Sequence, residues 1–238
     1  MSEAILKVKG LNSCYGLVCA LKGIDFYARS REIVGIIGPN GAGKTTLLES
    51  IAGTHRITRG VIELDGNRIE QLAVIKRRRL GLMLIPQERN IFPLMSVLKN
   101  LDVGAKYSGK GERKRLLDYV FDLFPILWEK RKNDACTLSG GQQKMLAVGI
   151  GIASNARILL IDEPSIGLAP KLVTRLFETF GKIRDDTGKT VVLAEQNIKI
   201  LNIADRLFGL EAGEIKFDEQ TKNLSREVVT NLYLGNVG

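Results

Sequence analysis

The sequence predicts an α/β fold with a mainly parallel sheet, an N-terminal antiparallel β subdomain and an inserted helical lobe. Three observations predict it. A glycine-rich loop joins an apolar run to a helix-like run, later apolar runs end in polar side chains, and residues 88–153 change to helical periodicity. Continuous apolar runs of this length are typical of strands that are buried on both faces of a parallel sheet.

Length and composition indicate one folded domain. The chain has 238 residues, 45% hydrophobic and 26% charged, which predicts a single domain over 1–238 with a lobe inserted at about 88–153. No apolar run approaches the ~18 residues needed to span a bilayer. Residues 1–10 also lack the layout of a secretory signal, so we expect a cytoplasmic chain that only a partner holds at a membrane.

The chain is basic, because Lys and Arg number 35 against 26 Asp and Glu, a formal net charge of +9. Such a balance is compatible with nucleic acid or an anionic membrane surface. However, the basic clusters at 76–79, 110–115 and 130–132 lie far apart, and no aromatic residues are interleaved with them. We therefore expect solvated surface or proximity to lipid headgroups, and no nucleic-acid partner.

The first residues predict short strands at 4–9 and 20–28, joined by a polar turn that contains Tyr15. Tyr15 either packs half-buried or stacks on a base.

Cys14, Cys19 and Cys136 form no metal-type pair, and their odd number argues against a complete disulfide framework, so we expect reduced packing thiols. The sole histidine, His55, lies in a polar loop and is expected at the surface.

A phosphate-loop pattern follows, and it predicts the core of a P-loop NTPase. The pattern comprises Gly38, Pro39, Asn40, Gly41, Ala42, Gly43, Lys44, Thr45 and Thr46. A strand-like run at 33–37 leads into it and a helix-like run at 46–52 leads out, as phosphate binding by backbone N–H groups at a helix N-terminus requires. Lys44 is expected to neutralise the outer phosphates, and Thr45 to offer a hydroxyl to Mg²⁺.

After a hairpin-like stretch at 61–67, the run 81–86 predicts a buried strand, and Gln87 directly follows it. Side chains at the carboxyl ends of parallel strands lie where doubly wound sheets bind ligands. Helical periodicity then predicts helices at 95–101, 113–124 and 140–152. Ser139, Gly140, Gly141 and Gln142 precede or open the last of these. They form either a simple helix cap or a second phosphate-binding helix N-terminus.

The run 157–164 predicts a buried strand that ends in Asp162 and Glu163. Because burying a carboxylate is costly unless it is paired or near a metal, two acids at a strand end indicate Mg²⁺ chemistry. We expect Asp162 to hold the ion through water, and Glu163 to polarise a water molecule that attacks the γ-phosphate.

The rest of the chain predicts a helix at 170–184, a strand at 190–194 that leads into Glu195, Gln196 and Asn197, and a helix at 198–204. Strands at 207–210 and 214–217 follow, and the tail at 225–234 has the pattern of a terminal helix.

The phosphate loop, Gln87, the Leu-Ser-Gly-Gly-Gln stretch and Ile-Asp-Glu-Pro occur in the order and spacing of ABC transporter ATPases, which this chain resembles over nearly its whole length. The resemblance implies ATP and Mg²⁺ as cofactors. It also implies that Tyr15 stacks on adenine, that Gln87 is a Mg²⁺-linked residue facing the helical lobe, and that residues 139–142 close on the ATP of a partner.

Within the family the chain is similar to the smaller ATP-binding subunit of branched-chain amino-acid importers. The narrower match rests on Pro86 with residues 89–93, and on the stretches 165–170, 194–197 and 232–235. Two positions depart from the general family pattern: Ala169 stands where most members have an aspartate, and Gln196 where most have the switch histidine. Both departures resemble the branched-chain subgroup, and they predict a slower site with Glu163, Lys44 and Gln196 as its catalytic residues.

The resemblance implies a second ABC ATPase subunit, in a homodimer or heterodimer, and two membrane-spanning permease subunits. An extracytoplasmic solute-binding protein would be an indirect partner, and the chain would be peripheral on the cytoplasmic side of the membrane. Three alternatives remain open at this point: the ATPase subunit of a urea or short-amide importer, a soluble ABC factor outside transport, and an ATP-dependent scaffold with little turnover.

Overall fold

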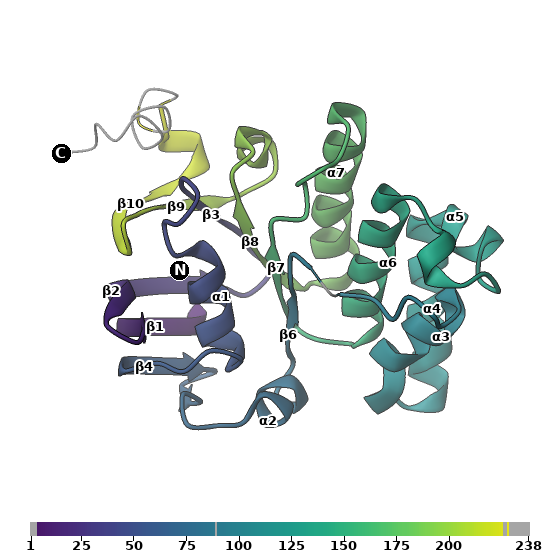
Figure 1. Cartoon of the computed structure of the whole chain (residues 1–238), viewed down its shortest axis with the longest axis horizontal. Coiled ribbons are helices and arrows are strands. Elements are labelled where there is room, and N and C mark those ends of the chain that lie inside the picture. The colour runs from purple at the N-terminus through teal and green to yellow at the C-terminus, as the bar shows by residue number, and fades with distance from the viewer. Residues whose placement is uncertain (1–3, 89, 226–227, 229–238) are drawn as a thin grey trace.

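The computed structural model describes residues 4–88, 90–225 and 228, and these form two sheets flanked by helices (Figure 1). The strands are β1 (Ala4–Tyr15), β2 (Val18–Arg29), β3 (Ile33–Ile37), β4 (Arg59–Leu64), β5 (Asn67–Arg68), β6 (Leu82–Ile85), β7 (Ile158–Asp162), β8 (Thr190–Glu195), β9 (Arg206–Glu211) and β10 (Glu214–Gln220). The α-helices are α1 (Lys44–Ala52), α2 (Val74–Arg79), α3 (Val97–Gly104), α4 (Lys110–Leu123), α5 (Pro125–Glu129), α6 (Gly140–Ala153) and α7 (Pro170–Thr187).

The central sheet has the order β10-β9-β3-β8-β7-β6 within the described residues. All its neighbouring strands run parallel except β10, which pairs antiparallel with β9. Every residue of β3, β7 and β8 is buried, which explains why these strands are continuous apolar runs in the sequence. The expected mainly parallel sheet is therefore confirmed, and the carboxyl ends of β3, β8 and β7 lie at one edge.

The second sheet is the antiparallel subdomain, with the order β2-β1-β4-β5 in the described chain. Its first two strands are longer than the expected short strands. β1 continues through the predicted polar turn to Tyr15, where it pairs with Val18. Alternating burial along β1 and β2 packs one face of this sheet on the core and leaves the other polar, as an antiparallel sheet allows.

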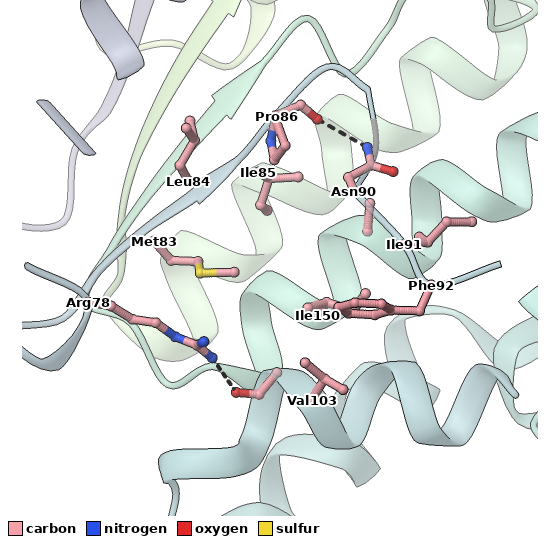
Figure 2. A pocket seen from close by; sticks show the side chains of 12 residues that line it. Arg78, Met83, Leu84, Ile85, Pro86, Asn90, Ile91, Phe92, Val103 and Ile150 are labelled. Carbon is pink, nitrogen blue, oxygen red and sulfur yellow. Dashed lines mark hydrogen bonds between the residues drawn. The ribbon is translucent and has the colours of Figure 1, made fainter. Parts of the chain in front are cut away.

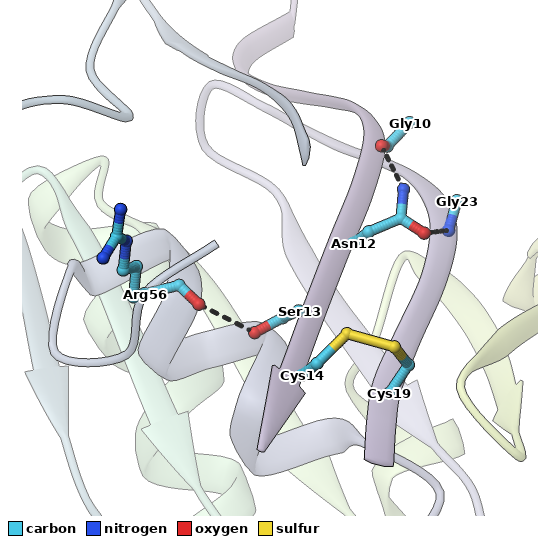
Figure 3. Close-up of a disulfide and its surroundings, with 7 residues drawn as sticks. All are labelled: Gly10, Asn12, Ser13, Cys14, Cys19, Gly23 and Arg56. Atoms are coloured by element: carbon cyan, nitrogen blue, oxygen red, sulfur yellow. Dashed lines mark hydrogen bonds between the residues drawn. A yellow bond between two sulfur atoms is a disulfide. The ribbon is translucent and has the colours of Figure 1, made fainter. Parts of the chain in front are cut away.

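The expectation of reduced cysteines is wrong for two of the three. Cys14 and Cys19 face each other across the β1–β2 hairpin, with Cα atoms 3.9 Å apart, and form a disulfide (Figure 3). The odd count concealed the pair because Cys136 alone remains a free, exposed thiol. Nearby, the amide of Asn12 bridges the two strands by donating to Gly10 O at 2.9 Å and accepting from Gly23 N at 3.1 Å.

The helical lobe consists of α3 to α6 and lies on the opposite side of β6 and β7 from α1 (Figure 1). α3 begins two residues later than the predicted start at 95, because the hydroxyl of Ser96 caps it by accepting from Lys99 N at 3.2 Å. The short helices α2 and α5 were not predicted, since neither is long enough to show a clear period.

In the described part of the chain, the central sheet separates two apolar cores. One lies between the sheet, α7 and the helical lobe, and the other between the sheet, α1 and the antiparallel subdomain.

The helix expected at 198–204 is a 3₁₀ helix over Ile198–Asn202. The terminal helix expected at 225–234, and the matched residues 89 and 232–235, lie largely outside the described residues. Among the helices that are described, none combines the length and the apolar character needed to cross a membrane.

Candidate functional site

The phosphate loop leaves β3 and enters α1, and two of its glycines are required by close approach. A Cβ at Gly38 would lie 2.0 Å from Leu210 O. Gly43 has a φ of +108°, and a Cβ there would lie 2.7 Å from Ala20 O. The loop is therefore packed tightly against β9 and β2 and keeps its backbone free of side chains, as the approach of a phosphate chain requires.

Lys44 opens α1 and is buried, with an exposed fraction of 4%. Its Nζ donates to Gly38 O at 2.9 Å and to Pro39 O at 3.0 Å, so the side chain of Lys44 folds back onto the backbone at the start of the phosphate loop. The same Nζ lies 3.2 Å from Oε1 of Glu163, the residue that directly follows β7. The structure thus joins a predicted phosphate-binding cation to the predicted general base.

Asp162 is buried at the end of β7, and burial raises the pKa of its carboxyl to about 6, against the opposing effect of a hydrogen bond from Thr45. Its Oδ1 has no hydrogen-bond partner within the described part of the chain. A buried carboxylate oxygen without a partner, beside a hydroxyl, fits a site that a hard cation completes. No cluster of three or more His, Cys, Asp or Glu side chains occurs among the described residues, so a cation here would also need other oxygens.

Glu163 has a φ of +42°, an uncommon backbone conformation for a residue with a side chain. Gln196, which follows β8, donates from Nε2 to Oε1 of Glu163 at 2.8 Å. The same amide nitrogen donates to Oδ1 of Asn40 in the phosphate loop at 2.6 Å. The predicted residues Asn40, Lys44, Glu163 and Gln196 therefore meet at one point, where β3, β7 and β8 end.

Gln87 follows β6, one strand further along the same sheet edge. Its backbone carbonyl accepts a hydrogen bond of 2.8 Å from Nζ of Lys144 on α6. Burial lowers the pKa of Lys144, while the carboxylates of Asp162, Glu195, Glu88 and Glu163 oppose that effect. A lysine of the helical lobe is thus linked to the loop that carries Gln87, and sequence reasoning did not single it out.

Residues 139–142 form the N-terminus of α6. Ser139 and Gln142 make a reciprocal capping box, in which Ser139 N donates to Oε1 of Gln142 at 3.1 Å. Ser139 and Gly140 are exposed, and α6 lies well apart from α1 in Figure 1. The structure therefore does not bring this helix N-terminus to the phosphate loop of its own chain.

Tyr15 lies at the tip of the β1–β2 hairpin and is 52% exposed. Its ring stacks on the ring of His55, with centroids 4.2 Å apart, so His55 is half-buried rather than fully at the surface. Because β2 contacts Gly43 through Ala20 and Leu21, the hairpin and the phosphate loop are neighbours. The position of Tyr15 is compatible with contact to a base whose phosphates bind that loop.

An apolar pocket opens between β6, the loop after Gln87 and the helices α3 and α6 (Figure 2). Phe92 lines it and is 48% exposed. The buried amide of Asn100 shapes the loop, since it accepts from Phe92 N at 2.7 Å and donates to Phe92 O, Met95 O and Ser96 O. The hydrogen bonds of Asn100 therefore fix the backbone of the loop, while the apolar side chains of Ile91 and Phe92 line the pocket.

Glu195, the last residue of β8, is a buried carboxylate at the same sheet edge that the sequence analysis did not single out. It accepts hydrogen bonds from Ser165 N at 2.9 Å and from Ser165 Oγ at 2.8 Å. The criterion that identified Asp162, an acid at the end of an apolar strand, applies equally to Glu195 and could have found it.

Comparison with known proteins places these features in a family. Residues 21–166 match the family model described as ABC transporter. The high-affinity branched-chain amino acid transport ATP-binding protein BraG of Pseudomonas aeruginosa is 36% identical over 97% of this chain and 100% of that protein. The probable branched-chain amino acid transport ATP-binding protein LivF of Archaeoglobus fulgidus is 35% identical over 92% of this chain and 94% of that protein.

Solved structures show the same architecture. The ADP conformation of MJ1267, an ATP-binding cassette of an ABC transporter, superposes with a TM-score of 0.87 at 25% identity, over 98% of this chain and 100% of that one. A dimeric post-hydrolysis state of the cassette MJ0796 bound to ADP and Pi gives a TM-score of 0.82 at 27% identity, over 91% and 98%.

Proposed function

This chain belongs to the ABC transporter family of ATP-hydrolysing proteins, and we propose that it is the smaller ATPase subunit of a branched-chain amino-acid importer. The meeting of Lys44, Glu163, Gln196 and Asn40 carries the ATPase part of the proposal. The transported substrate is supported by the two relatives named for branched-chain amino acids, which match almost end to end.

The phosphate loop binds the triphosphate of ATP. Backbone N–H groups of residues 38–46 and the N-terminus of α1 supply partial positive charge, and Lys44 supplies a full one. Because Lys44 is buried, its charge acts through little water and stabilises phosphate oxygens strongly. Tyr15 contacts the adenine from the neighbouring hairpin.

Hydrolysis uses Glu163 as the general base. Its carboxylate takes a proton from a water molecule in line with the γ-phosphate, while Gln196 and Lys44 hold that carboxylate from two sides. Lys44 also stabilises charge on the phosphoryl group in the transition state. Catalysis is thus mainly positioning and electrostatics.

Thr45, Asp162 and Gln87 would hold Mg²⁺. The hydroxyl of Thr45 and the unpartnered Oδ1 of Asp162 offer the hard oxygen atoms that this ion prefers, and phosphate oxygens of ATP would supply further ligands. When bound, the ion would neutralise phosphate charge, and Asp162 would then be held in its ionised form.

A second ATPase subunit completes each site. Ser139 and Gly140 are exposed at the start of α6, away from their own phosphate loop, so a facing chain is needed for them to contact ATP. The dimeric form of the related cassette MJ0796 supports this arrangement. Two permease subunits would hold the pair at the cytoplasmic membrane face, with the pocket around Phe92 receiving a short permease helix.

Two variants test the ATPase site. Glu163→Gln should keep ATP binding and lower kcat by about 10²–10⁴-fold, because an amide cannot accept the proton. Lys44→Ala should instead remove most ATP binding, since the phosphates lose their nearest buried cation. Calorimetry with ATP and steady-state phosphate release distinguish the two. Normal ATP affinity in Lys44→Ala would exclude this loop as the nucleotide site.

Uptake measurements test the substrate. Cells that depend on this chain and carry Glu163→Gln should lose uptake of labelled leucine, isoleucine and valine, while uptake of ribose and urea continues. Retained leucine uptake, in cells where the variant's ATPase activity is lost, would contradict the branched-chain assignment and leave the ATPase assignment standing.

A further inference from the structure

Glu195 connects two loops that border the ATPase site. Its carboxylate is 1% exposed and accepts four hydrogen bonds. Two come from Ser165 N and Oγ, and two come from the backbone N–H groups of Gln196 and Asn197, at 3.2 and 3.3 Å. Burial raises the pKa of this carboxyl, and the four donors oppose that effect. The donors belong to the loop after β7 and the loop after β8, so one side chain ties both together.

The loop after β7 needs such an anchor because Glu163 has a φ of +42°. A residue with a side chain persists in that conformation only where the surrounding structure holds it. On one side Glu163 N donates to Ala194 O at 2.9 Å, next to Glu195 in β8. On the other side the chain is held at Ser165, two residues on, by both bonds to Glu195.

The loop after β8 carries Gln196, whose amide contacts the carboxylate of Glu163. The backbone N–H of Gln196 donates to Oε2 of Glu195, the same oxygen that accepts from Ser165 Oγ. Two consecutive side chains therefore hold the loop that carries Glu163. Gln196 contacts the carboxylate of Glu163, and Glu195 binds Ser165 two residues further along that loop.

We propose that Glu195 is a positioning residue for ATP hydrolysis, which holds Glu163 and Gln196 in their productive arrangement by clamping Ser165 to the end of β8. The proposal rests on the role of Glu163 as general base given above. Glu195 itself does not touch the phosphate loop through any described contact, so nucleotide binding and the proton-accepting geometry should respond differently to its loss.

The test is Glu195→Gln in the full chain assembled with its partner subunits. The substitution keeps the size and shape of the side chain. However, whichever way the amide is turned, its NH₂ group faces at least one backbone N–H that Glu195 now accepts from, so the clamp is broken. We expect kcat for ATP to fall on the order of tenfold, which corresponds to about 1.4 kcal/mol of transition-state stabilisation. KM and the Kd for ATP should stay within about twofold.

Glu32→Gln is the matched control. Glu32 is also buried, at 9% exposure, and accepts a backbone hydrogen bond, from Arg29 N at 2.7 Å. It lies just before β3, at the end of the sheet opposite to the phosphate loop. We expect Glu32→Gln to lower the melting temperature without a specific loss of kcat. Amide exchange should accelerate over 163–168 in Glu195→Gln and not in Glu32→Gln.

Ser165→Ala removes one of the bonds and should lower kcat by a smaller factor. The double variant Glu195→Gln with Ser165→Ala should be no slower than Glu195→Gln alone, because both changes break the same clamp. Additive losses would overturn the proposal, since they would mean that the two residues act separately.

Glu163→Gln, measured alongside, separates the failure of this inference from that of the proposed function. If Glu163→Gln is inactive while Glu195→Gln keeps the wild-type kcat, the positioning role is wrong and the base assignment stands. If Glu163→Gln keeps the wild-type kcat, the base assignment fails and the inference fails with it.

Discussion

The amide of Gln196 lies 2.8 Å from Oε1 of Glu163, and that same oxygen lies 3.2 Å from Nζ of Lys44. One carboxylate oxygen is thus shared between a neutral donor in the loop after β8 and a cation from α1. Gln196, which stands where most members of the family have the switch histidine, thus contacts the proposed general base, and it does so without the charge that a protonated histidine would add.

Replacing Gln196 by histidine should raise turnover of the assembled transporter by up to about tenfold. A charge-assisted hydrogen bond to the γ-phosphate is worth roughly 1.5–3 kcal/mol, against about 1 kcal/mol for a neutral one. The difference corresponds to about a factor of ten in rate. Steady-state ATP hydrolysis measures it, with Gln196→Ala as the control that should be slower than the wild type. An unchanged rate in Gln196→His, together with lost transport in Glu163→Gln, would show that Gln196 is already competent.

Phe92→Ser should prevent assembly with the permease subunits while the chain stays folded. Phe92 is half-exposed in the pocket of Figure 2, so its removal costs little core packing, about 1 kcal/mol or less. Co-purification and thermal unfolding are the two measurements. Asn100→Ala is the contrasting variant and should lower the melting temperature clearly, because its side chain makes four hydrogen bonds to the loop. A large drop with Phe92→Ser would indicate a core residue instead.

Reducing the disulfide between Cys14 and Cys19 should lower the free energy of unfolding by about 2 kcal/mol, the entropy expected for so short a closed loop. Denaturant unfolding with and without reductant measures this. Cys136→Ser should remain sensitive to reductant, whereas the double variant Cys14→Ser with Cys19→Ser should not respond. Alkylation of the denatured, unreduced chain should modify one thiol. Modification of three would contradict the pairing.

The buried Lys189 predicts a pH dependence of stability. Burial lowers the pKa of its ammonium from 10.5 to about 8, while Nζ donates to Ala156 O. Between about pH 8 and 10.5 the unfolded chain therefore binds more protons than the folded one, and the contribution of Lys189 to stability rises with pH. At pH 7 it opposes folding by about 3 kcal/mol, because lowering the pKa from 10.5 to about 8 makes the charged form that much less stable in the folded chain.

Lys189→Met isolates this effect. The advantage of the variant over the wild type in unfolding free energy should be larger at pH 7 than at pH 10, by about 2.5 kcal/mol. Matched denaturant titrations at the two pH values measure it. A constant difference between variant and wild type would show that Lys189 titrates normally.

The sequence by itself determined the central strands and the residues at their ends. β3, β7 and β8 are continuous apolar runs because both faces of each are buried, and that pattern is local. The phosphate loop is equally local, since its glycines and Lys44 act within one strand-to-helix turn. Helix starts were less accurate, as the Ser96 cap of α3 shows, because periodicity does not mark which polar residue ends the preceding loop.

Only the tertiary structure decided which side chains meet. Glu195 and Ser165 are 30 positions apart, and Lys144 and Gln87 are 57 apart; their contacts depend on the strand order β3-β8-β7-β6, which no local pattern encodes. The cysteine pair depends on the register of β1 against β2, which places Cys14 opposite Cys19 and leaves Cys136 elsewhere. Apolar periodicity records burial, but hydrogen-bond partners and disulfides are set by register and strand order, which arise only when the sheets assemble.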